Sequence, residues 1–208
     1  RILANDGIDK IAADELAARG FEIDRGHYAK EELKAKIKDF DVLIVRSATK
    51  VDQEIIDAAA QGDLRLIVRA GVGIDNIDAA YAQMRGIEVR NTPNASSDSV
   101  AELVLGHMFS LARFISIANV TMRDGKWNKK EYEGVELAGK TLGIIGFGRI
   151  GRSLAEKASA LGMDVMFHDI CVKNDEKFEY AEFDALIKNA DFISVHTPFT
   201  GEALIGEE

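Results

Sequence analysis

The chain has 208 residues, with 26 Lys and Arg against 35 Asp and Glu, and therefore a formal net charge of −9. Apolar residues make up 47% and charged residues 29%, which excludes a disordered chain, and the acidic balance argues against a nucleic-acid binder. No apolar run approaches the roughly 20 residues that span a bilayer. The single cysteine, Cys171, excludes an internal disulfide and favours a reducing compartment. We therefore expect a cytoplasmic protein with neither a membrane nor a nucleic-acid partner.

The first 93 residues alternate short apolar runs with helical patterns. Strands are expected over residues 2–4, 21–23, 42–45, 64–68 and 87–89, and helices over residues 8–19, 29–38, 52–61 and 76–85. The first helix is expected to bury a face made of Ile8, Ile11, Ala12 and Leu16, whereas the highly charged second helix is expected to be exposed. Strand–helix alternation predicts a parallel sheet covered by helices on both faces, as a domain over residues 1–93.

One long helix is expected next, over residues 96–122. An apolar stripe with helical spacing runs along it, made of Val100, Leu103, Val104, Met108, Leu111, Phe114, Ile115 and Ala118. The opposite side is also apolar, at Leu105, Phe109 and Ile117. A helix that is apolar all round must be buried all round, so we expect either a core helix or a subunit interface.

The remaining residues repeat the strand–helix alternation after a polar connection over residues 124–139. Strands are expected over residues 141–145, 164–167 and 192–195, and helices over residues 149–161 and 183–189. This predicts a second doubly wound parallel sheet, in a domain over residues 94–208. Because that fold has about six strands, we expect only its N-terminal half to be present.

A glycine motif carries the strongest functional signal of the sequence. Gly146, Gly148 and Gly151 form G-x-G-x-x-G directly between an expected strand and an expected helix. Gly146 permits the tight turn, Gly148 lets the backbone approach a pyrophosphate, and Gly151 lets the helix pack close to the strand. The N–H groups around Arg149 and Ile150 then face the phosphates from the positive end of the helix. The motif predicts a dinucleotide site.

Asp169 ends the second strand of this domain, 18 residues after Gly151 (169 − 151). A carboxylate at that place accepts hydrogen bonds from the ribose hydroxyls and repels a 2′-phosphate. No Arg or Lys follows at once, so the pattern favours NAD over NADP. The alternative is an ordinary surface acid at a strand end.

Two arginines lie just past the carboxyl ends of expected strands in the first domain. Ligands collect at that edge of an open α/β sheet, and two guanidinium groups converging there suit a phosphate. Arg46 and Arg69 are therefore candidates for binding a phosphorylated substrate, with Lys50 nearby in sequence. The alternative is that both arginines form structural ion pairs. His27 and His107 have no partner motif.

Several segments together resemble the D-isomer-specific 2-hydroxy acid dehydrogenases over essentially the whole chain. The matching segments are residues 45–51, 69–78, 91–94, 99–103, 125–127 and 134–140, the glycine motif, and His196-Thr197-Pro198. The resemblance implies a flavodoxin-like substrate domain followed by a Rossmann NAD domain. It also implies that the helix over residues 96–122 crosses a homodimer axis.

The resemblance also assigns roles to individual residues. It places the substrate at Ser47, beside Arg46, and at the backbone of Val72 and Gly73. It places the dinucleotide at Arg149, Ile150, Asp169, Thr197 and Pro198. For His196 it implies a place in the cofactor loop, and the alternative is a polar residue that ends a buried strand.

The family's chemistry needs an Arg that polarises the substrate, a His that takes the hydroxyl proton and a Glu that orients this His. By resemblance the Arg lies in an Arg-Gly pair late in the NAD domain, and the His follows a proline. The Arg-Gly pairs here are at residues 19–20, 25–26 and 85–86, and neither proline precedes a His. We therefore expect the chain as given to lack all three catalytic residues.

The expected activity is NAD-dependent oxidation of D-3-phosphoglycerate to 3-phosphohydroxypyruvate by the parent protein, because the resemblance is greatest to the family members that act on it. Another D-2-hydroxy acid, such as glycerate or glycolate, is the alternative within this class. A non-catalytic NAD-binding protein of the same fold is the alternative outside it. No metal site is expected.

Overall fold

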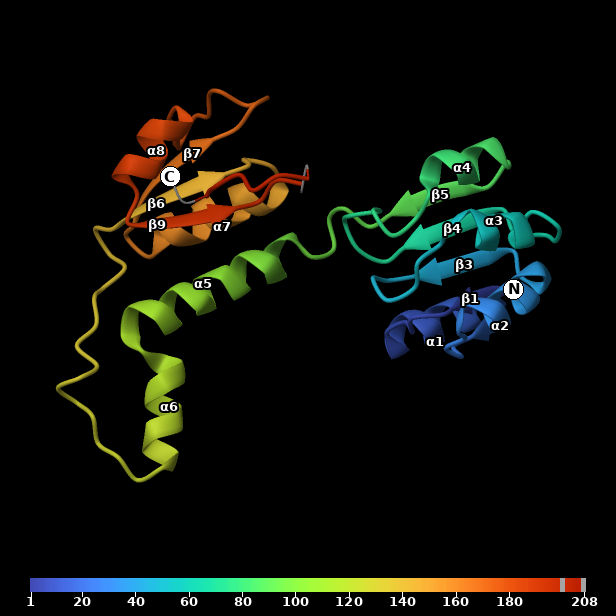
Figure 1. Cartoon of the computed structure of the whole chain (residues 1–208), viewed down its shortest axis with the longest axis horizontal. Helices are drawn as coiled ribbons and strands as arrows, with labels where there is room; N and C mark the ends of the chain where they lie inside the picture. The colour runs from blue at the N-terminus through green and yellow to red at the C-terminus, as the bar shows by residue number, and fades with distance from the viewer. Residues whose placement is uncertain (199–200, 207–208) are drawn as a thin grey trace. The chain divides into compact units, whose positions relative to one another are not determined.

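The computed structural model describes residues 1–198 and 201–206 of the chain (Figure 1). It consists of two compact units, Arg1–Ser96 and Ser97–Glu208. The division falls close to the domain boundary expected after residue 93.

The first unit is built on a parallel sheet with the strand order β2-β1-β3-β4-β5. Its strands are β1 (Ile2–Ala4), β2 (Ile23–Asp24), β3 (Val42–Val45), β4 (Leu66–Arg69) and β5 (Glu88–Asn91). The order reverses between β1 and β3, which is the flavodoxin-like arrangement, and ligands bind such sheets at the carboxyl edge near this point. The predicted doubly wound parallel sheet is confirmed.

Helices cover both faces of this sheet. They are α1 (Lys10–Ala18), α2 (Lys30–Lys36) with a 3₁₀ turn η1 (Ile37–Asp39), α3 (Gln53–Ala59) and α4 (Ala79–Met84). Successive strand residues point to opposite faces, so Leu3 joins the core under α2, α3 and α4, while Ile2 and Ala4 join the core that includes Leu16 of α1. Asp52 and Asp78 cap α3 and α4 through their side chains.

Three details of the first unit differ from the sequence-based prediction. Ile11 is 70% exposed and Ala13 is buried instead, so the buried face of α1 is rotated from the predicted one. The strand expected over residues 21–23 begins two residues later, because β2 pairs with β1 only from Ile23 onward. The second helix is not wholly exposed, since Leu33 is fully buried among the core side chains.

The single helix expected over residues 96–122 is wrong. The chain breaks at Phe114, whose φ of 55° is left-handed, and forms α5 (Ser97–Arg113) and α6 (Ile115–Arg123). Within the unit, α5 buries one face at Ala101, Met108 and Ala112, and no residue of α6 is buried among the described residues. The expectation of burial on every side is therefore not met within one chain.

No single helix in the described ranges is long and apolar enough to cross a membrane. Helices α5 and α6 satisfy the criteria of length and composition only when taken together, and they are bent by 63° relative to each other.

The second unit contains a parallel sheet with the strand order β8-β7-β6-β9. Its elements are β6 (Thr141–Ile145), α7 (Arg149–Ala160), β7 (Asp164–His168), β8 (Glu179–Tyr180), α8 (Phe183–Asn189) and β9 (Phe192–Val195). Taking β6 as strand 1, the order is 3-2-1-4, which is that of a Rossmann domain. The predicted fold class is confirmed, and β8, which has two residues, is the strand that the sequence analysis missed.

Candidate functional site

The glycine turn joins β6 to α7 at the carboxyl edge of the second sheet. Gly146 has a φ of +94°, and a Cβ there would lie 2.7 Å from the carbonyl oxygen of His196. A Cβ at Gly151 would lie 2.3 Å from the carbonyl oxygen of Gly146. Both positions therefore require glycine for the fold itself. Gly148 differs, because a Cβ there meets no described atom within 4 Å. The space in front of Gly148 is open to a ligand.

Helix α7 begins at Arg149, with Gly148 as its N-cap residue. A glycine has no side chain to cap the helix, so the first N–H groups of α7 donate to no side-chain acceptor at this position. These N–H groups and the positive end of the helix dipole form a site for an anion. Arg149 is exposed and Ile150 is half-buried in the same first turn.

Asp169 connects the glycine turn to the loop that follows β7. Its Oδ2 accepts a hydrogen bond from the N–H of Phe147 at 2.7 Å, and its Oδ1 accepts from Cys171 at 2.8 Å and Val172 at 3.0 Å. Burial opposes ionisation of this carboxyl, but these three hydrogen bonds outweigh it and hold the pKa of Asp169 below its ordinary value. A carboxylate has about four acceptor positions, so Asp169 retains capacity for a ribose hydroxyl.

The segment after β9 lies beside the glycine turn. β9 pairs with β6, and the N–H of His196 donates to the carbonyl of Ile145 at 2.7 Å. Thr197 and Pro198, which follow, are exposed. The strand order reverses between β6 and β9, so the turn and this segment flank the topological switch point where such folds bind ligands.

His196 itself is half-buried, and its Nε2 lies 2.9 Å from the hydroxyl oxygen of Ser194. Burial lowers the pKa of His196 below its ordinary value, which favours the neutral ring.

These features together fit a dinucleotide. They supply open space at Gly148, free N–H groups at the start of α7, and an ionised carboxylate at Asp169 with acceptor capacity remaining. The structure therefore brings the predicted cofactor residues of the second unit to one edge of its sheet. The role of each residue remains a prediction.

In the first unit, Arg46 follows β3 directly and Arg69 is the last residue of β4. Neither arginine belongs to any ion pair among the residues that the structure describes, which disfavours the structural alternative. Arg46 and Ser47 are exposed. The guanidinium of Arg69 folds over Gly71, where a Cβ would lie 1.3 Å from Nη1, so only glycine allows this approach.

Two residues at the end of the fifth strand hold the loop that carries Val72 and Gly73. The side-chain amide of Asn91 donates to the carbonyl of Val72 at 2.6 Å, and the N–H of Thr92 donates to the carbonyl of Gly71 at 3.0 Å. Val72 and Gly73 are exposed, and their backbone N–H groups donate to no backbone carbonyl among the described residues. The predicted substrate residues thus lie at the carboxyl ends of β3 and β4, which are adjacent strands, and on the loops that follow them.

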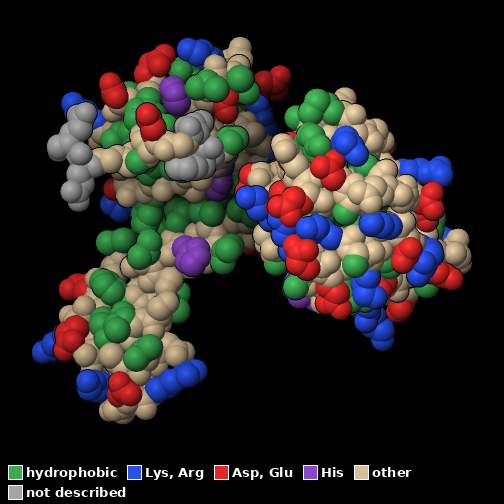
Figure 2. Space-filling view, turned by 45° about the vertical axis from the view of Figure 1, so that its right-hand side comes forward, with side chains coloured by type: hydrophobic (Ala, Val, Ile, Leu, Met, Phe, Trp, Pro, Cys, Tyr) green, Lys and Arg blue, Asp and Glu red, His purple; other side chains and the backbone are tan. Residues whose placement is uncertain are grey.

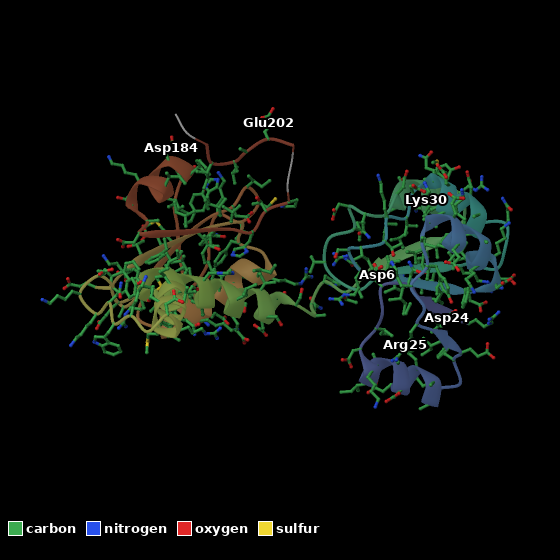
Figure 3. All side chains as sticks on the ribbon, turned by 60° about the horizontal axis from the view of Figure 1, so that its bottom comes forward. Asp6, Asp24, Arg25, Lys30, Asp184 and Glu202 are labelled. Carbon is green, nitrogen blue, oxygen red and sulfur yellow. The ribbon has the colours of Figure 1, made fainter. Side chains whose placement is uncertain are left out.

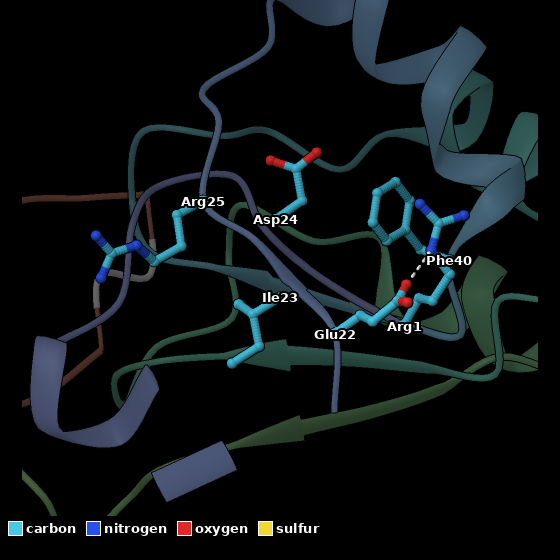
Figure 4. A pocket seen from close by; sticks show the side chains of 6 residues that line it. All are labelled: Arg1, Glu22, Ile23, Asp24, Arg25 and Phe40. Carbon is cyan, nitrogen blue, oxygen red and sulfur yellow. Dashed lines mark ion pairs between the residues drawn. The ribbon is translucent and has the colours of Figure 1, made fainter. Parts of the chain in front are cut away.

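A separate hollow lies along β2 (Figure 4). It is lined by Arg1, Glu22, Ile23, Asp24, Arg25 and Phe40, and an ion pair of 3.1 Å joins two of these residues, through Arg1 Nε and Glu22 Oε2. None of these residues belongs to the predicted substrate set, so we do not assign this hollow to the substrate.

Asp6, Asn5 and Asn76 were missed by the sequence analysis. Their side chains hold the loop that carries Arg46. Asp6 follows β1 at the same sheet edge, so the signal that selected Arg46, a charged residue just past a strand, was also present at Asp6.

Known proteins match both units of the chain, and a family model matches the second unit. Residues 105–205 match the family described as D-isomer specific 2-hydroxyacid dehydrogenase, NAD binding domain. The hydroxypyruvate reductase of Thermotoga maritima is 47% identical over 202 residues, which are 96% of this chain and 65% of that protein. The D-3-phosphoglycerate dehydrogenase of Methanocaldococcus jannaschii is 43% identical over 216 residues, covering 100% of this chain and 41% of that protein.

Solved structures show the same fold. The TT0316 protein of Thermus thermophilus has a TM-score of 0.87 and 32% identity, covering 97% of this chain and 66% of that one. The D-lactate dehydrogenase of Aquifex aeolicus, solved with NAD and lactic acid, has a TM-score of 0.79 and 28% identity, covering 96% of this chain and 61% of that one.

Two doubly wound units, the second an NAD-binding domain, define the class of protein. The chain belongs to the D-isomer specific 2-hydroxyacid dehydrogenase family. It spans 65% of the length of the T. maritima relative and 41% of the M. jannaschii relative. The expected NAD cofactor is confirmed.

Proposed function

We propose that the protein carrying this chain is an NAD-dependent dehydrogenase that oxidises D-3-phosphoglycerate to 3-phosphohydroxypyruvate, the oxidation that leads to serine. The observation that carries the proposal is the pair Arg46 and Arg69 at one sheet edge, without ion-pair partners in the described residues. Two such guanidinium groups suit a phosphate dianion. Curated relatives named D-3-phosphoglycerate dehydrogenase, from several organisms, support it.

A second candidate is reduction of hydroxypyruvate or a related unphosphorylated acid. The T. maritima hydroxypyruvate reductase is 47% identical, against 43% for the M. jannaschii phosphoglycerate dehydrogenase. The two candidates differ in the phosphate group, so the role of the arginines decides between them. A non-catalytic NAD-binding protein of the same fold would show no turnover with either substrate.

The chain's own residues account for binding. The first turn of α7 holds the cofactor phosphates, and Asp169 accepts from the ribose and repels a 2′-phosphate, which favours NAD over NADP. When bound there, NAD would supply the hydride acceptor for oxidation at C2 of the substrate. The backbone of Val72 and Gly73 holds the substrate carboxylate, and Arg46 and Arg69 hold the phosphate. The expectation that this chain lacks the Arg, Glu and His implied by the resemblance stays a prediction, and we assign no proton acceptor here. The cytoplasmic location likewise stays a prediction.

Replacing Arg46 or Arg69 by Ala is expected to raise the Michaelis constant for D-3-phosphoglycerate by about 10- to 150-fold. A lost hydrogen bond to a charged group costs about 1.5–3 kcal/mol, and about 1.4 kcal/mol corresponds to tenfold. The constant for glycerate, which has no phosphate, should rise much less. Arg90→Ala is the matched control, because Arg90 is exposed on β5 and pairs with Glu88. Equal losses on both substrates would contradict a phosphate role.

We further propose that α5 and α6 form a homodimer contact. Leu111 is 72% exposed and Phe109 is 37% exposed on α5, and Ile115, Ile117, Val120 and Met122 are exposed on α6. Figure 2 shows hydrophobic side chains gathered along this part of the second unit. An exposed apolar face of this extent marks an interaction site, and homodimers are usually two-fold symmetric.

Phe109→Glu or Leu111→Glu should convert a dimer to a monomer in analytical ultracentrifugation. Leu105, which the sequence analysis placed on the second apolar side of the helix, does not suit this test because it packs against the core of its own unit. Ile11→Glu, at a residue 70% exposed on α1, is the control that should leave the dimer intact. A wild-type protein that sediments as a monomer would end this proposal.

A further inference from the structure

The loop of residues 46–49, here called the substrate loop, is held by side chains at both of its ends. We propose that Asp6, on the loop after β1, is a positioning residue that fixes the substrate loop so that Arg46 and Ser47 face the substrate. The inference rests on the proposed function, because it assumes that Arg46 binds the phosphate. Asp6, labelled in Figure 3, lies two residues after the end of β1.

The carboxylate of Asp6 accepts hydrogen bonds from both ends of the substrate loop. Its Oδ2 accepts from the N–H of Arg46 at 2.7 Å and the N–H of Thr49 at 3.0 Å, and its Oδ1 accepts from the hydroxyl of Thr49 at 2.5 Å. The Asp6 side chain is only 3% exposed. Hydrogen bonds to a buried carboxylate are among the strongest in proteins, so Asp6 fixes the two ends of the loop relative to β1.

Two asparagines also hold the substrate loop through hydrogen bonds. The side-chain amide of Asn76 donates to the carbonyls of Arg46 at 2.8 Å and Thr49 at 2.7 Å. The side-chain amide of Asn5 donates to the hydroxyl of Thr49 at 2.8 Å. The N–H and the carbonyl of both end residues are therefore held by side chains from other elements. Asn5 and Thr49 are buried, whereas Arg46 and Ser47 are exposed.

The charge of Asp6 is directed at the backbone and not at the arginine side chain. Burial opposes its ionisation, but the hydrogen bonds from Thr49 and Arg46 outweigh burial and hold the pKa of Asp6 below its ordinary value. Among the described residues, Asp6 forms no ion pair with Arg46, so it does not compete with a ligand for the guanidinium. Asp6 therefore fixes the position of the Arg46 backbone, and with it the direction in which the Arg46 side chain extends.

A displacement of about 1 Å in a positioned group can cost up to about 100-fold in rate. We therefore expect Asp6→Asn to raise the Michaelis constant for D-3-phosphoglycerate between about 10- and 100-fold, with a smaller change in kcat and no change in the constant for NAD. Thr49→Val, which removes the hydroxyl hydrogen bonds, should act in the same direction, and Thr49→Ser should restore the wild-type constant. Asp24→Asn is the matched control, because Asp24 also accepts from a backbone N–H, that of Gly26 at 2.8 Å, but outside the substrate loop.

The experiment is a double-mutant cycle on the protein that carries this chain, with thermal unfolding recorded for every variant. If Asp6 acts through Arg46, Asp6→Asn should raise the constant for D-3-phosphoglycerate in the wild type and add little in the Arg46→Ala background. The positioning role would be overturned if Asp6→Asn raised this Michaelis constant equally in both backgrounds. It would also be overturned if Arg46→Ala raised the constant while neither Asp6→Asn nor Thr49→Val changed it. Should Asp6→Asn fail to fold, the Thr49→Val and Thr49→Ser pair decides by itself. If Arg46→Ala has no effect, the proposed phosphate contact is wrong, which is a separate result.

Discussion

Replacing Gly148 by Asp is expected to weaken NAD binding more than 100-fold while leaving the thermal unfolding temperature unchanged or higher. A Cβ at Gly148 meets no described atom within 4 Å, and the residue has the extended backbone of an N-cap, with φ −79°. Asp is among the best N-cap residues, so the fold without ligand should tolerate it. The new carboxylate would lie where the first turn of α7 faces a pyrophosphate. Placing these two negative charges side by side costs several kcal/mol of binding free energy.

The control for charge is Gly148→Asn, which has the same shape and a similar preference for the N-cap. It should weaken NAD binding by about tenfold through its bulk alone, a loss of about 1.4 kcal/mol. The control for the fold is Gly151→Ala, where a Cβ would lie 2.3 Å from the carbonyl oxygen of Gly146. That overpacking should cost about 1–3 kcal/mol of stability. Unchanged NAD affinity in both Gly148 variants, measured by titration calorimetry, would contradict the phosphate site.

Asp169→Ala is expected to weaken NAD binding by about 10- to 150-fold and to lower stability at the same time. The variant loses the acceptor for the ribose, worth about 1.5–3 kcal/mol. It also leaves three backbone N–H groups, those of Phe147, Cys171 and Val172, without their partner. Asp169→Asn removes the charge and replaces one acceptor oxygen by an NH2 group, which cannot accept from the backbone N–H groups, so it should lose the discrimination against NADP together with part of the stability. Calorimetric titration of both variants with NAD and NADP checks this, and an unchanged affinity ratio would show that Asp169 does not select the cofactor.

The depressed pKa of Asp169 also predicts a pH dependence of stability. A carboxyl whose folded-state pKa lies below its ordinary value of 3.8 stabilises the fold above that value. This contribution is lost as the pH falls through the folded-state pKa. The difference in unfolding free energy between wild type and Asp169→Asn should therefore shrink as the pH falls below about 4.

The sequence located the strongly patterned elements of the second unit correctly. β6, α8 and β9 have the predicted bounds, because each is a short apolar or amphipathic run with clear flanking residues. The break between α5 and α6 could not be predicted, since Phe114 is neither glycine nor proline and adopts its left-handed conformation in a tertiary context. There Phe114 stacks on Tyr132 at 5.7 Å, and Ser110 lies 2.7 Å from Ser116 across the break.

Only those parts of the candidate site that depend on local sequence patterns could be predicted. The glycine motif and Asp169 are local patterns with fixed spacing, and the structure places them together. The bracing of the substrate loop by Asp6 and Asn76 joins residues 40 and 30 positions from Arg46, and such pairs leave no periodic signal in one sequence. The motif already assigned Gly148 to the pyrophosphate, and the structure adds that a Cβ there meets no described atom within 4 Å, so the fold itself does not require this glycine.

The central proposal is tested most directly by steady-state kinetics of the protein that carries this chain, with NAD and either D-3-phosphoglycerate or D-glycerate as substrate. With Arg46 and Arg69 free to bind a phosphate, we predict a kcat/KM at least about tenfold higher for D-3-phosphoglycerate, and a preference that largely disappears in Arg46→Ala. An equal or higher kcat/KM for D-glycerate, unaffected by Arg46→Ala, would contradict the proposal and favour an enzyme for unphosphorylated hydroxy acids.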